Sequence, residues 1–184
     1  AFNTAIGYAA GTAVTTGVKN TFLGGLAGDA TTDADENVAI GYDSLGTNIL
    51  GGASVAVGAS ALRTQNPASA VTMYNTAVGH FAGYAVTTGV QNTLIGGLAG
   101  DANTTADNMT AVGYQALTTY NRTDGANSNN TAVGAGAFLA LTTGNANTAV
   151  GSEAGANQQG AANCTFLGYR AGKDSTGESN TFVG

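Results

Sequence analysis

Charged side chains are scarce in this chain. Only 9% of the 184 residues are charged, against roughly 25% in a typical soluble domain, and five of them are basic, giving a formal net charge of −6. A nucleic-acid surface needs a basic stripe, so this composition argues against a nucleic-acid partner. Proline occurs once and tryptophan not at all, and we find no apolar run that would insert into a membrane.

Cysteine and histidine are nearly absent as well. Cys164 is the only cysteine, so an intrachain disulfide cannot form, and with His80 as the only histidine there is no zinc constellation. What is abundant is glycine, with 29 residues, within a chain that is still 43% hydrophobic. That hydrophobic content argues for a folded chain rather than a disordered one.

The chain repeats a short phrase of the type Asn-Thr-Ala-Val-Gly. The intervals between its closing glycines are 17, 17, 17, 21, 17, 17, 21, 17, 17 and 16 residues, and the glycines are Gly7, Gly24, Gly41, Gly58, Gly79, Gly96, Gly113, Gly134, Gly151, Gly168 and Gly184. Residues 10–30 and 82–102 also match at an offset of 72 with four differences. The two longer units carry four extra residues within 63–74 and 118–129, as loops inserted into a regular coil would.

Each position of the phrase suggests a structural role. The branched residue before the glycine, from Ile6 to Val183, is expected to face a core, and the glycine to stand at a corner where a Cβ would clash. Asparagine occurs four residues before most of these glycines. Stacked coils would align these amides in a ladder in which each side chain bonds its neighbours. The asparagines are Asn3, Asn20, Asn37, Asn75, Asn92, Asn130, Asn147 and Asn180.

These features predict one all-β domain over residues 1–184, a parallel β-solenoid of about ten 17-residue coils. A second strand per coil is expected in segments such as 13–17, 85–89 and 140–144. The phrase strand is apolar on both faces, with Phe22 and Phe166 among the residues beside the branched column. A strand of this kind is normally covered on both sides, so we expect a homo-oligomer, with three copies around an axis. The alternative is that Phe22 and Phe166 pack within their own chain.

The stretch SVAVGASAL (54–62) resembles the repeat in the head domains of trimeric autotransporter adhesins, which are left-handed parallel β-rolls. The NTAVG variant, with TTG between phrases, is similar to segments of phage tail-fibre proteins and of secreted bacterial tail-fibre-domain proteins. The resemblance implies a left-handed roll, a homotrimer, and a segment of a longer fibre on a virion or outside a cell. The units of this chain are longer than those of the adhesin heads.

No catalytic site can be nominated, and we expect neither enzymatic activity nor a cofactor. His80 lies in a slot that alternates large and small residues, which packing explains, and Cys164 takes an asparagine slot as a buried thiol. The acidic residues Asp29, Asp33, Asp35 and Glu36 form a weak calcium candidate, with a solvated loop as the alternative.

The sequence favours a structural and adhesive fibre segment that binds a host-cell surface glycan or protein. Loops carry function on rigid scaffolds, so the predicted contacts lie in the two insertions: Tyr74, Tyr120, Asn121 and Arg122. One alternative is an ice-binding solenoid with stacked threonines, although Val38 and Val55 interrupt them. Another is a fibre-borne polysaccharide depolymerase, for which no carboxylate pair stands out.

Overall fold

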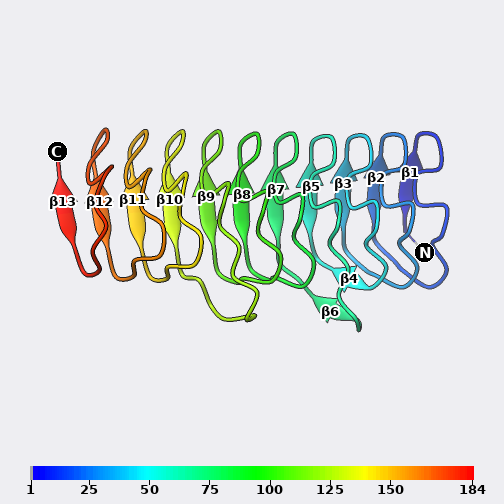
Figure 1. Ribbon diagram of the computed structural model, residues 1–184. Helices are drawn as coiled ribbons and strands as arrows, with labels where there is room; N and C mark the ends of the chain where they lie inside the picture. Colours follow the sequence, from blue (N-terminus) through cyan, green and yellow to red (C-terminus); the bar gives the residue numbers. More distant parts are fainter. Residues whose placement is uncertain (1) are drawn as a thin grey trace.

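The computed structural model describes residues 2–184 and shows a parallel β-solenoid of about eleven turns (Figure 1). Within these residues there is no helix. One strand of each turn joins an 11-stranded sheet, and neighbours in the sheet follow chain order. These strands are β1 (Thr4–Ile6), β2 (Thr21–Leu23), β3 (Val38–Ile40), β5 (Val55–Val57), β7 (Thr76–Val78), β8 (Thr93–Ile95), β9 (Thr110–Val112), β10 (Thr131–Val133), β11 (Thr148–Val150), β12 (Thr165–Leu167) and β13 (Thr181–Val183).

All strand pairs in the sheet are parallel and in the same register, for example Thr93 with Thr110 and Ile95 with Val112. At about 4.8 Å per strand the eleven strands form a rod about 50 Å long. The predicted solenoid and its repeat register are therefore confirmed.

The corner glycines behave as predicted. At Gly96, φ is +131° and a Cβ would lie 2.5 Å from the backbone oxygen of Gly113 in the next coil. The other corner glycines with a following coil meet the next corner in the same way. A side chain at this corner would both strain the backbone and push adjacent coils apart.

The side of the strand that faces the core is the reverse of our prediction. In the sheet strands from β2 to β12 the middle residue points inward and is buried, as Phe22, Leu94 and Ala111 are, whereas the branched residue before the glycine points outward. Ile95, for example, is 38% exposed. Phe22 and Phe166 thus pack within their own chain, because the narrow coil accepts the alanine column and an occasional large side chain.

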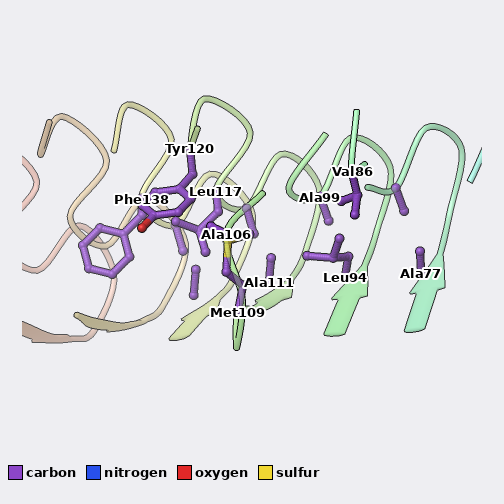
Figure 2. Packing of buried hydrophobic residues seen from close by; sticks show 14 of the residues in the cluster. Ala77, Val86, Leu94, Ala99, Ala106, Met109, Ala111, Leu117, Tyr120 and Phe138 are labelled. Atoms are coloured by element: carbon purple, nitrogen blue, oxygen red, sulfur yellow. The ribbon is translucent and has the colours of Figure 1, made fainter. Parts of the chain in front are cut away.

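The interior of each coil is filled from two sides, by the middle residue of the strand and by a residue in the turn after the corner glycine (Figure 2). Where the strand supplies Ala111, the turn beyond the glycine supplies Leu117; where the strand supplies Leu94, the turn has Gly100. A Cβ on Gly100 would lie 2.7 Å from Leu94 Cδ2. The large side chain comes from the strand in some coils and from the turn in others. This pattern recurs every four coils, which explains the 72-residue duplication.

The predicted second strand of each coil is wrong. Segments 13–17, 85–89 and 140–144 form turns and bends, and the only other strand pair in residues 2–184 is β4 (Gly51–Gly52) with β6 (Val71–Thr72). The return path of each coil, from the corner glycine to the start of the next strand, is too tightly curved for a strand ladder. It passes through several residues with φ near +50° to +60°, such as Leu98 and Gln91.

The asparagine ladder exists, but its bonds differ from those predicted. Seven of the eight amides bind the backbone of the next coil rather than another asparagine, and Asn180 donates to the carbonyl of Gly177. Asn92 Oδ1 accepts the N–H of Met109 at 2.9 Å, and Asn92 Nδ2 donates to the carbonyl of Ala106 at 3.0 Å. Because both backbone groups are buried, the side chain supplies partners that water cannot.

Candidate functional site

Two loops interrupt the regular coil, and both leave the rod on the same edge (Figure 1). The first lies between β5 and β7 and includes β6; the second lies between β9 and β10. They occupy equivalent places in coils that are three turns apart, or about 14 Å along the rod. The two loops, residues 63–74 and 118–129, therefore form one candidate surface.

The first loop is held at its base by polar contacts. Arg63 pairs with Asp43 and lies 5.9 Å from the ring centre of Tyr84. The buried Gln65 donates to Ser54 Oγ at 3.1 Å. These contacts leave residues 68–72 and Tyr74 exposed, with Tyr74 63% exposed.

Tyr120 in the second loop is not a surface residue. Its side chain is fully buried and lies in the core beside Leu117 and Phe138 (Figure 2). Its hydroxyl makes no hydrogen bond within residues 2–184. Burial raises the pKa of the phenol, and the nearby Ser128 offsets part of this increase. The prediction that Tyr120 contacts a partner is therefore wrong: it anchors the loop from inside.

Asn121 is exposed on the second loop, and the Arg122 side chain is partly buried, with 19% of it exposed. Asn121 accepts a 2.8 Å hydrogen bond from Thr104, and Arg122 forms a two-pronged pair with Asp124 that lowers the pKa of that carboxyl. The pair fixes the backbone of a loop in which Thr123, Asp124, Asn127 and Asn129 are exposed and Ser128 is buried. An open hollow of about 340 Å³ lies between this loop and the next coil, lined by Asn121, Arg122, Thr123, Asp124, Thr143 and Asn145. Planar amide, guanidinium and hydroxyl groups of this kind can bind a polar ligand such as a glycan.

The acidic segment does not assemble into a cation site. Asp33 and Asp35 accept hydrogen bonds from the preceding coil, which lower the pKa of Asp33, and Glu36 pairs with Lys19 at 2.8 Å. Burial raises the pKa of Asp29. Within residues 2–184 no three His, Cys, Asp or Glu side chains are placed to hold a metal ion. The calcium candidate is therefore not supported, because the carboxylates of Asp33, Asp35 and Glu36 bond to the preceding coil instead.

The outer face of the large sheet is the second notable surface. Its strands contain no charged residue, and their outward positions form one column of threonines, with Val38 and Val55, beside one column of branched apolar residues. Ile6, Leu23 and Leu167 are 60%, 43% and 48% exposed. No hydrogen bond within residues 2–184 uses the hydroxyls of these strand threonines, whereas turn threonines such as Thr87 bind neighbouring coils.

His80 and Cys164 lie apart from both loops. His80 is exposed and its ring centre lies 4.0 Å from that of Phe81. Its slot does relieve packing between coils, since Tyr114 lies over Gly97, and Tyr42 over Gly25. Cys164 is buried in the asparagine slot, as predicted, with Sγ 3.4 Å from the carbonyl of Gly177.

The chain matches no family model, no curated protein and no solved structure. Among the described residues there is no helix of the length and apolar character that a membrane span requires.

Proposed function

We propose that this chain is a structural and adhesive segment of an extracellular fibre, of the phage tail-fibre or bacterial surface-adhesin kind, which presents two loops to a host-cell glycan or protein. The observation that carries the proposal is the position of the loops. In a rod whose other coils have 17 residues, or 16 in the last, both 21-residue coils open on one edge, three turns apart. A rigid rod with exposed loops suits recognition rather than chemistry.

The contacts proposed for the partner are Tyr74, Asn121 and Arg122. Replacing all three by alanine is expected to abolish attachment of the fibre to its target cells, while the thermal midpoint changes little because their side chains lie outside the core. The matched control is Gln91→Ala, an exposed residue that takes the place of Tyr74 on a regular coil. Attachment that survives the triple substitution would refute the proposed contacts.

We further propose that copies associate through the outer face of the sheet, as a homotrimer of left-handed rolls. A contiguous apolar column without charge is typical of an interface, and the resemblance to adhesin heads implies three copies. Light scattering is expected to give three times the monomer mass. Ile95→Glu, which places a charge on this face, is expected to give monomers that keep the fold. A monomeric native chain would contradict the proposal.

The free threonine hydroxyls on the same face favour one second candidate, ice binding. A flat column of hydroxyls at a constant spacing of about 4.8 Å suits a ligand that is itself a lattice. Thermal hysteresis by a monomeric protein, lost in Thr110→Lys, would support this candidate. Its absence, together with a threefold mass, would exclude it.

A further inference from the structure

The residue in the asparagine slot predicts which coils depart from 17 residues. Seven slots hold an asparagine that bonds to the next coil, and the interval to the next slot is 17 residues in all seven. The other three slots hold Ser54, Met109 and Cys164, and the intervals that follow are 21, 21 and 16 residues. Every irregular coil of the rod thus follows a slot without asparagine.

The asparagine pins one point on the return path of the next coil. Its Nδ2 donates to the carbonyl of the residue three before the next slot, at 2.7–3.0 Å in the seven cases. That pinned residue is always small and always buried: Gly17, Ala34, Gly51, Gly89, Ala106, Gly144 and Ala161. At the three slots without asparagine the corresponding residues, Thr72, Asn127 and Gly177, are all exposed.

Where a slot has no asparagine, a side chain of the following loop bonds to the asparagine of the next slot. After Ser54, the buried Gln65 Oε1 accepts from Asn75 Nδ2 at 2.9 Å. After Met109, the hydroxyl of Ser128 in the loop itself accepts the N–H of Asn130 at 3.2 Å. Each loop therefore contributes one polar contact to the next asparagine, and neither loop has the amide bond to its own return path.

We propose that the asparagine amide is a clamp that holds the return path against the core, and that Ser54 and Met109 are the positioning residues that allow the two loops to leave it. A return path whose carbonyl is bound to the coil beneath cannot bulge without leaving that carbonyl and the amide unpaired in a buried site, which is costly. Naming these loops as recognition elements rests on the proposed function; the clamp itself does not.

The same rule marks Cys164 as a third permissive slot. Its thiol is a weak donor, and it lies 3.4 Å from the exposed Gly177 carbonyl, in a coil that is one residue short. A loop inserted in residues 173–177 is therefore expected to be tolerated, as the natural loops are in their own coils.

A double-mutant cycle that combines a longer coil with the loss of the asparagine tests the proposal by thermal unfolding. Four residues inserted after Thr104, in the coil that follows Asn92, are expected to lower the midpoint by about 10 °C, and Asn92→Ser alone by about 5 °C. The double variant should melt no lower than the insertion alone, because the clamp is already broken. Losses that add would overturn the proposal.

The converse variant keeps the test decisive if the insertion does not fold. Deleting four residues from loop 118–129 and introducing Met109→Asn should together melt at least about 5 °C above the deletion alone, since the new amide meets a coil of 17 residues. An equal or lower midpoint would overturn the proposal. Because unfolding does not depend on a receptor, failure here is distinct from failure of the attachment assay.

Discussion

Exchanging the large side chain between the strand and the turn of one coil tests the account of the core most sharply. In the coil of β8, Leu94 fills the interior and Gly100 makes room for it. One turn later Ala111 and Leu117 divide the space the other way. The double variant Leu94→Ala with Gly100→Leu turns the first arrangement into the second.

The two single substitutions should each be costly. Leu94→Ala removes a fully buried side chain and is expected to cost about 2–5 kcal/mol. Gly100→Leu brings a Cβ within 2.7 Å of Leu94 Cδ2 and should cost about 1–3 kcal/mol through overpacking. Backbone strain adds little, because Leu117 has φ of 53°, close to the 57° of Gly100.

The double variant should recover most of that loss. Leu94 also covers Gly83 in the preceding coil, so a small gap remains there and the rescue is incomplete. We expect the double variant to lie within about 2 kcal/mol of the native chain, with a favourable coupling of about 2–4 kcal/mol. Urea unfolding followed by far-UV circular dichroism measures all four corners of the cycle, and losses that simply add would refute the shared interior.

Three further predictions concern the corner, the clamp and an ion pair. Gly96→Ala is expected to lower stability by more than about 4 kcal/mol in urea unfolding, and Gly97→Ala, one residue on, to be nearly neutral, since its Cβ meets only ordinary contacts; equal losses would contradict the corner geometry. Asn147→Ala leaves a buried N–H and carbonyl unpaired and should cost about 2–4 kcal/mol, with faster amide exchange at the next coil as the check. Hydrogen bonds from Arg170 and a neighbouring lysine lower the pKa of Glu153 to about 2. The small stabilisation from this pair is therefore complete above about pH 4.5, is lost as the pH falls toward 2, and should be absent from the pH profile of the melting temperature of Glu153→Gln.

Much of the fold follows from spacing alone, because a solenoid repeats its sequence as it repeats its coil. The intervals between glycines locate the strands, the corners and both loops. The inward face could not be assigned from residue types, since the strand carries apolar residues on both faces. A better signal is the covariation of volume: where the middle strand residue is Leu94 or Phe166, the turn position is glycine, so both positions must share the interior.

The candidate site was less predictable from the sequence. Tyr74 and Asn121 are exposed in loops that the spacing locates. Tyr120 stands seven residues after Gly113, in register with the buried Val86 and Leu141, and this register was the signal that the loop assignment overlooked. Its burial depends on the space that the alanine column leaves beside Leu117. The calcium site was predicted from acidic residues that are close in sequence, but the hydrogen-bond partners of Asp35 and Glu36 lie 17 residues away on another coil.

The most direct test of the stacked coil is a pair of spin-label distances. Labels at Thr21 and Thr131 are six strands apart and those at Thr21 and Thr165 eight apart, on one face of the sheet. In a Cys164→Ser background, diluted with unlabelled chain, pulsed electron resonance should give about 29 Å and 38 Å, a rise of about 4.8 Å per coil. Distances that do not grow with the number of coils, such as two equal values, would contradict the solenoid.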